Sequence, residues 1–321
     1  MRRIIPEASG LARTVLPGGN VLDVTYRPAR PEDLETGLRI VETAFNELRV
    51  RNGLRPVTLR EPAFQRFAHA EDPTGLWVAE AEGTIIGFAF SWMRQRFWYL
   101  AQLFIRPDIQ ARGIGQALMS RTLEQAARHG AENRALITPG YNMASTGLYI
   151  RNGLYPHEPL YRLVAPTVVL ADRLVLESDT MATPLGPIPG EHAWLDAVEE
   201  AVIGFQRETQ HRFMQSTLGL RALRIDARGR PAGYAYISAE GHIGPLLAAP
   251  EADEVTVVLA AIRAGLIGEP KQISLIVPGR AERMLAALSS LGFRIEESML
   301  MMAARSFGDW ARYLPNSPGV M

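Results

Sequence analysis

A strand, a loop containing a proline and an apolar helix follow one another twice in this chain, and this repeat restricts the fold more than any other feature. The first copy is FWYLAQLFI at 97–105, the loop RPDIQARGIG and a helix expected over 113–129. The second is HIGPLLA at 242–248, the loop APEADE and the run VTVVLAAIRAG. A predicted β-hairpin precedes each strand, at 76–92 and at 223–238. At 321 residues the chain has room for two domains of about 150 residues, so two copies of one fold are predicted in tandem.

The order of elements predicts a mixed α+β domain over residues 24–165. Along the chain it has a strand, two helices, three strands, a helix, a strand, a helix and a strand. Residues 1–23 are expected to form a loose N-terminal arm, and 166–190 a linker with several prolines, although 168–176 within it also fits a strand. A second domain is expected over 191–321, in which a buried strand is followed by a helical end in ESMLMMAARSFGDW.

Composition excludes several kinds of protein and partner. Lys+Arg and Asp+Glu number 34 each, so no overall field favours nucleic acid or an anionic membrane, and neither partner is expected. The absence of cysteine excludes disulfides and thiolate zinc sites, and no metal is expected. The N-terminus has no continuous apolar signal core, and no run reaches the about 18 apolar residues of a membrane span. A cytoplasmic protein is therefore expected.

The first loop suits phosphate binding. The start of a helix leaves backbone N–H groups without partners and carries partial positive charge. Glycines at Gly113 and Gly115 let a phosphate approach the backbone, whereas any side chain there would hold it away. The alternative is an ordinary turn in which the glycines only relieve steric crowding. No Gly-Lys-Ser/Thr follows, and the spacing of a dinucleotide fingerprint is absent, so neither nucleotide motif is indicated.

Two motifs resemble the GNAT acetyltransferases. Gln110-x-x-Gly113-x-Gly115, following a strand, resembles the family's coenzyme A signature, Q/R-x-x-G-x-G/A. Downstream, NMASTGLYIRNGL, from Asn142 to Leu154, resembles the motif N-x-x-A/S-x-x-x-Y-x-x-x-G-F, with leucine in place of the final phenylalanine. The resemblance spans the first domain. It implies that the chain is two tandem acyl-CoA N-acyltransferase (GNAT) folds, each a mixed, mostly antiparallel sheet flanked by helices.

The resemblance also implies how acetyl-CoA is held. A bulge is expected in the strand before the loop, and backbone groups of that strand would bind the pantetheine arm while amides of the loop bind the pyrophosphate. The strand residues are Leu103, Phe104 and Ile105, and the loop residues are Gln110, Ala111, Arg112, Gly113, Ile114, Gly115 and Gln116. Arg112 would add positive charge, or is simply a solvated loop residue. Asn142 would reach the cofactor from across the cleft, or only caps the helix that follows it.

The resemblance places a general acid at Tyr149, which would protonate the departing thiolate; the alternative is a packed helix tyrosine. A backbone N–H of the strand would meet the developing oxyanion. The general base is not identified, because many relatives use a glutamate on the strand FWYLAQLFI, which here has no acid or histidine. Gln102 cannot accept the proton. Glu47, His69, Glu80 and a water chain are remote alternatives, and none is favoured.

The second copy lacks these features. EADEV replaces the glycine loop, and its carboxylates would repel a pyrophosphate, while Leu288 takes the tyrosine position. A degenerate domain kept for packing, for shaping the acceptor pocket or for dimerisation is predicted. Five aromatic residues either line an acceptor pocket or, more often for strand aromatics, belong to the core. They are Trp92, Phe97, Trp98, Tyr99 and Tyr141. Three methionines either face a substrate channel or, more often for methionines on a strand, belong to the core: Met299, Met301 and Met302.

Two functions follow from the resemblance. The first is an N-acetyltransferase that moves the acetyl group of acetyl-CoA directly to a primary amine of a small molecule or peptide. The second is a non-catalytic acyl-CoA-binding sensor or interaction protein. Both require acetyl-CoA as the ligand and no metal, and both suit a monomer or a homodimer. The acceptor is not named by any motif.

Overall fold

The computed structural model describes residues 10–15, 21–59, 61–174, 179–186 and 192–321. It divides into two compact units, 1–134 and 135–321, and the division falls within strand β6. The predicted arm over 1–9 and 16–20, and the predicted linker over 175–178 and 187–190, lie outside the described residues. The limits predicted for the two domains, 24–165 and 191–321, stay a prediction. None of the described helices is both long and apolar enough to cross a membrane.

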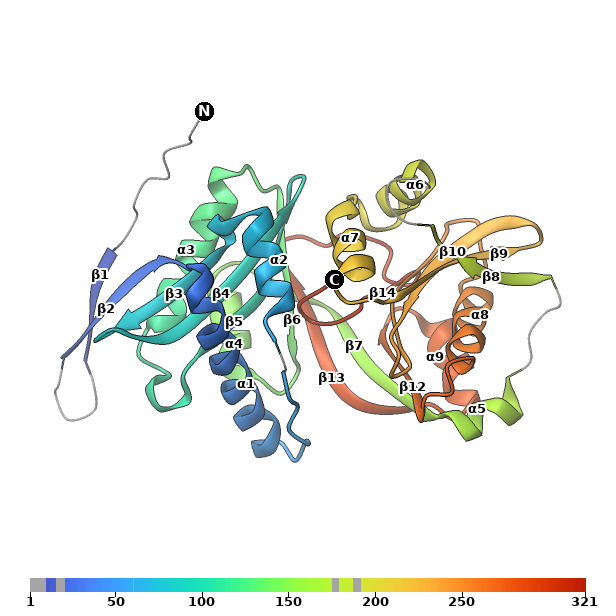
Figure 1. Cartoon of the computed structure of the whole chain (residues 1–321), viewed down its shortest axis with the longest axis horizontal. Helices are drawn as coiled ribbons and strands as arrows, with labels where there is room; N and C mark the ends of the chain where they lie inside the picture. The colour runs from blue at the N-terminus through green and yellow to red at the C-terminus, as the bar shows by residue number, and fades with distance from the viewer. Residues whose placement is uncertain (1–9, 16–20, 60, 175–178, 187–191) are drawn as a thin grey trace. The chain divides into compact units, whose positions relative to one another are not determined.

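The first unit is an antiparallel sheet with helices on both faces (Figure 1). Its strands pair in chain order: β1 (Gly10–Val15), β2 (Val21–Pro28), β3 (Leu76–Ala81), β4 (Thr84–Arg94) and β5 (Phe97–Ile105). Its helices are α1 (Leu34–Arg51), α2 (Ala63–Glu71) and α3 (Ile114–Arg128), with short 3₁₀ turns at Pro31–Asp33, Pro73–Gly75 and Pro107–Ile109. Strand β1 lies where a loose arm is expected, and it pairs with β2 along its whole length.

Successive side chains along each strand point to opposite faces of this sheet, so each face packs against different helices. Trp77 and Ala79 of β3 pack with Ile114 and Leu118 of α3 in one apolar cluster. On the other face the Phe88 ring meets α1, where a Cβ added at Gly37 would lie 2.6 Å from it. The glycine therefore lets α1 approach the sheet closely, and β5 is held between α1 and α3, as Figure 1 shows.

The second unit contains a larger sheet in the order β6-β13-β7-β12-β11-β10-β9-β8. The strands are β6 (Asn133–Pro139), β7 (Tyr155–Pro166), β8 (Thr180–Pro184), β9 (Arg221–Ala227), β10 (Arg230–Ile237), β11 (His242–Ala248), β12 (Gln272–Pro278) and β13 (Arg294–Ala303), and the two-residue β14 (Tyr313–Leu314) pairs with β11. The helices are α4 (Met143–Arg151), α5 (Thr167–Arg173), α6 (His192–Ile203), α7 (Glu208–Ser216), α8 (Glu254–Leu266) and α9 (Glu282–Ser290). Apolar residues of α8 and α9 fill the core against β9 to β12.

The element order confirms the predicted duplication. Strands β8 to β13 with α6 to α9 repeat the order of β2 to β7 with α1 to α4. Below, the "first repeat" is β2 to β7 and the "second repeat" is β8 to β13. The last strands of the two repeats interlock: β13 lies between β6 and β7, and β7 lies between β13 and β12, all antiparallel. Each repeat thus supplies a strand to the sheet of the other.

Two local predictions were wrong. The segment 168–176 was considered as a possible strand, but Thr167–Arg173 is helix α5, which buries Leu170 in the apolar cluster of the second unit. The helical end predicted after β13 is absent from the described residues: the chain turns at Gly308, whose φ of +65° does not suit a helix, and continues to β14. A further helix, α7, has no counterpart among the predicted elements.

Candidate active site

The strand that leads to the glycine loop carries the expected bulge. On β4, Phe90 faces Gln102 whereas Ser91 faces Leu100, so Ala101 is an extra residue on β5. A bulge twists a strand and interrupts its ladder. The first four residues of β5 are buried, and the last five, which include Leu103 to Ile105, are only half-buried. The end of β5 nearest the loop is therefore its more open part.

The loop after β5 is held by its own side chains. The Arg106 guanidinium binds the Asp108 carboxylate through two contacts, Nε to Oδ1 at 2.7 Å and Nη2 to Oδ2 at 2.9 Å. This pair lowers the pKa of Asp108 and balances its charge. The Gln110 side chain donates to the Ile105 carbonyl at 3.0 Å, and Arg112 donates to the Asp108 carbonyl at 3.3 Å. The Arg112 side chain thus folds back onto the loop backbone, and the Gln110 side chain links the loop to the end of β5.

The backbone of the loop opens the first turn of α3. Ala111 and Gly113 have φ angles of +61° and +81°, in the left-handed region that favours glycine. Gly113 is the N-cap, and no side chain caps the helix that starts at Ile114. A Cβ added at Gly113 would meet no atom within 4 Å among the described residues. The first N–H groups of α3 therefore lack helical partners, and the space at Gly113 is open. Such an arrangement suits an anion.

The downstream motif forms the start and the body of α4. Asn142 is the N-cap, since its Oδ1 accepts from the Ser145 N–H at 3.3 Å, as the capping alternative expects. Tyr149 lies one turn after Ser145 and is 6% exposed. Burial raises the pKa of Tyr149 to about 12, and a hydrogen bond with the Ser145 side chain partly opposes this. The phenol therefore keeps its proton at any physiological pH.

Comparison with known proteins agrees with these motifs. The model of the acetyltransferase (GNAT) family matches residues 42–154, which include both motifs. The chain carries a GNAT acetyltransferase domain. A mycothiol acetyltransferase of Streptomyces bingchenggensis is 29% identical over 163 residues, covering 49% of this chain and 51% of the relative. The chain thus spans about half the length of that curated relative, and 29% of the mycothiol acetyltransferase of Streptomyces coelicolor, to which it is 34% identical over 89 residues.

Solved structures resemble about nine-tenths of the chain and have the same fold. A putative acetyltransferase from Pyrococcus horikoshii has a TM-score of 0.69 at 18% identity, covering 93% of this chain and 96% of the other. A tandem GNAT protein from the clavulanic acid biosynthesis pathway has a TM-score of 0.60 at 16% identity, covering 88% and 99%. At these identities the likeness concerns the fold alone, and it supports two GNAT folds in one chain.

The side chains considered as a general base of the GNAT domain have other partners. Gln102 on β5 accepts a hydrogen bond from the buried Gln65 at 2.9 Å. Glu80 pairs with Arg27 at 2.7 Å. His69 Nε2 contacts the Ala29 carbonyl at 3.2 Å, and Glu47 contacts Arg51 on the surface of α1. None of these contacts indicates a base.

Most of the aromatic and methionine side chains belong to the core. Those on β4 and β5 are at most 5% exposed, and the three methionines on β13 are at most 4% exposed. The first group is Trp92, Phe97, Trp98 and Tyr99, and the second is Met299, Met301 and Met302. Tyr141 differs, because it is half-buried and donates to Glu297 at 2.6 Å.

In the second repeat, the position that corresponds to the phosphate loop is occupied by side chains and by the C-terminal segment of the chain itself. Asp253 caps α8 and accepts from the Thr256 N–H at 2.8 Å. The C-terminal segment runs along β11, where Ala248 N–H donates to the Arg312 carbonyl at 2.9 Å and Leu247 pairs with Tyr313. The Arg312 guanidinium donates to the carbonyls of Ala249 and Ala252, each at 2.8 Å. Leu288, at the tyrosine position, is fully buried.

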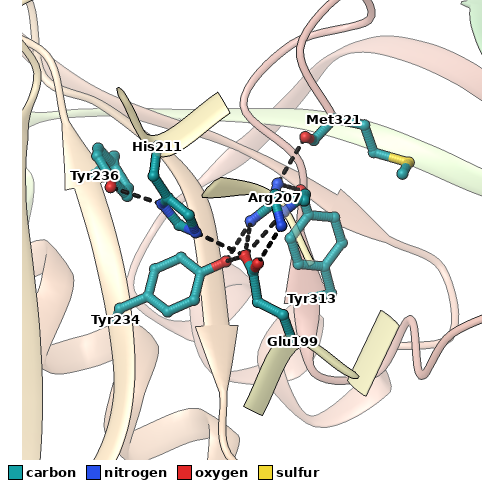
Figure 2. Close-up of polar contacts among 7 residues, drawn as sticks. All are labelled: Glu199, Arg207, His211, Tyr234, Tyr236, Tyr313 and Met321. Atoms are coloured by element: carbon teal, nitrogen blue, oxygen red, sulfur yellow. Dashed lines mark hydrogen bonds and ion pairs between the residues drawn. The ribbon is translucent and has the colours of Figure 1, made fainter. Parts of the chain in front are cut away.

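A buried polar cluster in the second repeat was missed from the sequence. Figure 2 shows the Glu199 carboxylate at its centre, with the Arg207 guanidinium at 2.8 Å, His211 Nε2 at 2.8 Å and the Tyr234 hydroxyl at 2.7 Å. Since a carboxylate at neutral pH only accepts, Nε2 carries the hydrogen, and Nδ1 pairs with the Tyr236 hydroxyl at 2.7 Å. The only sequence signal is that Glu199 shares the apolar face of α6 with Leu195 and Val202.

The cluster also anchors the C-terminal segment. Arg207 donates to the Tyr313 hydroxyl at 2.5 Å and to the main-chain oxygen of Met321 at 2.6 Å (Figure 2). Glu199 and Arg207 are both 0% exposed. Because no member of the pair reaches solvent, the cluster is a structural element that ties α6, α7, β10 and the C-terminal segment together.

Proposed function

We propose that the chain transfers the acetyl group of acetyl-CoA directly to a primary amine. One observation carries the proposal. Within the segment that matches the GNAT family, a bulged strand leads into a loop, and no side chain caps the helix that follows this loop. The first N–H groups of that helix therefore lie beside Gly113, a left-handed glycine with open space around it. Backbone N–H groups at a helix N-terminus are a preferred site for phosphate oxygens. The domain predicted over 24–165 would be the catalytic one.

The donor would be held mainly by backbone groups. Leu103, Phe104 and Ile105 supply them for the pantetheine arm, and the loop from Gln110 to Gln116 supplies amides for the pyrophosphate. The acidic side chain in this loop, Asp108, does not oppose the phosphates because Arg106 balances its charge. Arg112 adds a positive charge at the same loop. Asn142 already caps α4, so its part at the cofactor is secondary to that cap.

Tyr149 would assist the departure of the thiolate. Complete proton transfer from a phenol of pKa about 12 to a thiolate of pKa about 8.5 costs about 5 kcal/mol. Tyr149 therefore acts mainly by donating a hydrogen bond to the sulfur as its negative charge develops, which requires close positioning. A backbone N–H of β5 meets the carbonyl oxygen in the same step.

The test is release of free thiol from acetyl-CoA across a panel of primary amines. Because the aligned relatives are named mycothiol acetyltransferases, mycothiol lacking its acetyl group belongs in the panel with amino sugars, polyamines and short peptides. We expect turnover with at least one amine and a loss of roughly 100-fold or more in kcat for Tyr149→Phe. Tyr155→Phe, at a tyrosine that is 51% exposed, is the matched control. Full activity of Tyr149→Phe would refute the assignment of the acid.

The second candidate is a non-catalytic acyl-CoA-binding protein. It is favoured by the absence of an acid or histidine on β5, where Gln102 is bound to Gln65. Tight binding of acetyl-CoA by calorimetry, without thiol release from any amine of the panel, would select this alternative.

A further inference from the structure

Strands β11 and β12 of the second repeat pair in parallel over two residues only. These are His242 and Ile243 of β11, and beyond them the two strands do not pair among the described residues. From Leu246 onward, β11 pairs antiparallel with β14, and β14 also contacts β12. β14 belongs to the C-terminal segment, residues 309–321. This segment therefore lies where β11 and β12 splay apart.

The part of β11 that binds this segment corresponds to the part of β5 proposed to hold the pantetheine arm. Both strands end two residues before a proline, Pro107 in the first repeat and Pro250 in the second, which aligns residues 103–105 with 246–248. Each of the three residues 246–248 has a partner on the C-terminal segment. The pairs are Leu246 with Leu314, Leu247 with Tyr313, and the Ala248 N–H with the Arg312 carbonyl at 2.9 Å. A peptide strand thus pairs with the backbone at the equivalent position.

The loop after β11 matches a cation, whereas the loop after β5 suits an anion. The Arg312 guanidinium donates to the carbonyls of Ala249 and Ala252, each at 2.8 Å, and lies 3.5 Å from the Asp309 carboxylate. The first turn of α8 is already capped by Asp253, so it offers less to a phosphate than the uncapped α3 does. The charge of this loop has therefore been adapted to the arginine that it binds.

The backbone of the second repeat is also shaped around the segment. A Cβ added at Gly244 would lie 2.8 Å from both Asn316 Cα and the Pro315 carbonyl oxygen, so a residue with a side chain there would displace the segment. His242 Nε2 donates to the Asn316 carbonyl at 2.7 Å, because a carbonyl only accepts. Pairing of an extended peptide with a strand is a general mode of peptide binding.

We propose that the C-terminal segment is an internal ligand of the second repeat, bound through residues 312–316 as an extended peptide in place of an acyl-CoA arm. The comparison with pantetheine rests on the donor site proposed above, whereas the binding of the segment stands on the contacts within the second repeat. The second repeat is then a peptide-binding module, and its ligand is an extended chain that carries an arginine. A free peptide of the same sequence exchanges with the attached segment.

The experiment measures binding of a fluorescein-labelled peptide with the sequence of residues 309–321 to the full chain by fluorescence anisotropy. The attached segment competes at an effective concentration in the roughly millimolar range, so the unchanged protein should bind the peptide weakly. In Arg312→Glu only the attached segment is weakened, since the peptide keeps its arginine. Hydrogen bonds to a charged group change an equilibrium roughly 10- to 100-fold, so the apparent affinity for the peptide should rise by that factor. Arg263→Glu, at an exposed position of α8, is the matched control and should leave it unchanged.

Two further changes test where the peptide binds. A peptide in which glutamate replaces the arginine of position 312 should bind the Arg312→Glu chain at least about 10-fold more weakly than the native peptide. Adding Gly244→Ala to the Arg312→Glu chain should abolish the gain in affinity, because the new methyl group would meet the peptide at Pro315 and Asn316.

Three results would overturn the proposal: no gain in peptide affinity in Arg312→Glu, an equal gain with the glutamate peptide, or a gain that persists in Gly244→Ala. If Arg312→Glu does not fold, Tyr313→Phe carries the same comparison with a smaller gain expected, because it loses only the hydroxyl contact with Arg207. Thiol release from acetyl-CoA is measured separately. Its absence would refute the proposed acetyl transfer and leave the exchange of the peptide as the test of this inference.

Discussion

Replacing Glu199 by glutamine should remove much of the stability of the second repeat. Glu199 accepts from Arg207 three times, from its Nε at 2.9 Å, its Nη2 at 2.8 Å and its backbone N–H at 2.8 Å. Glutamine has nearly the same shape but no charge, so the Arg207 guanidinium would stay buried without a counter-ion. Breaking a buried pair by removing one partner costs about 3–5 kcal/mol.

The lowered pKa of Glu199 also indicates how much its ionised carboxylate contributes to the free energy of folding. Burial by itself raises the pKa of this carboxyl, but the positive charge of Arg207, with hydrogen bonds from His211 and Tyr234, lowers it to about 2, from 4.5 for an ordinary glutamate. At about 1.4 kcal/mol for each pKa unit, this difference corresponds to about 3 kcal/mol of folding free energy. A loss of about 3–4 kcal/mol is a large part of the 5–15 kcal/mol of unfolding free energy that is typical of a domain.

The sign of the pH dependence follows from the lowered pKa. The unfolded chain binds the proton first, so the contribution of Glu199 is complete above pH 4.5 and is lost as the pH falls toward 2. Urea unfolding followed by circular dichroism should show Glu199→Gln destabilised by about 3–4 kcal/mol at pH 7, with the difference shrinking below pH 4.5. Glu200→Gln, at the exposed neighbouring position, should change stability by less than about 0.5 kcal/mol. Equal midpoints for the two variants would refute the reasoning.

Two further predictions concern coenzyme A. Gly113→Ala should cost about 1 kcal/mol of stability because of its φ of +81°, and its methyl group would stand beside the first N–H groups of α3. Isothermal calorimetry should therefore show weaker binding of coenzyme A, whereas Gly53→Ala, with a φ of +73° on the remote end of α1, should cost similar stability and leave binding unchanged. Calorimetry of the unchanged protein should also give one coenzyme A per chain, since Asp253 and Arg312 occupy the corresponding place in the second repeat; two sites would contradict that view.

Local sequence patterns predicted most of the individual elements. Apolar spacing found α1, α3, α8 and α9, and the alternating runs around Gly83 and Gly229 found both hairpins, because these signals depend on residues close in the sequence. The same local character explains the errors. The stretch 167–173 is too short for helical periodicity to separate it from a strand, and the segment after β13 pairs with β11, a contact across more than 60 residues that no local pattern reveals.

In the candidate site, too, the residues within local motifs were predicted, whereas contacts between distant residues were not. The glycine loop, the N-cap Asn142 and the helix position of Tyr149 depend on a few consecutive residues, so the motifs alone identified them. The contact between Tyr141 and Glu297 could not be predicted, because the two residues are 156 positions apart in the sequence. The general base was sought on β5 because the family resemblance places a glutamate on that strand, which here has neither an acid nor a histidine.

The amino-acid sequence by itself determined that the chain is a duplicated α+β fold, that only one copy has a loop suited to phosphate, and that Tyr149 follows it on a helix. These features follow from backbone preferences and side-chain periodicity, which act over a few residues. Only the tertiary structure decided that β13 and β7 interlock, that Glu199 and Arg207 meet in a core without water, and that Glu297 joins the loop before α4. Strand pairing and the burial of charge depend on which distant segments come together, and many pairings are compatible with the same local pattern.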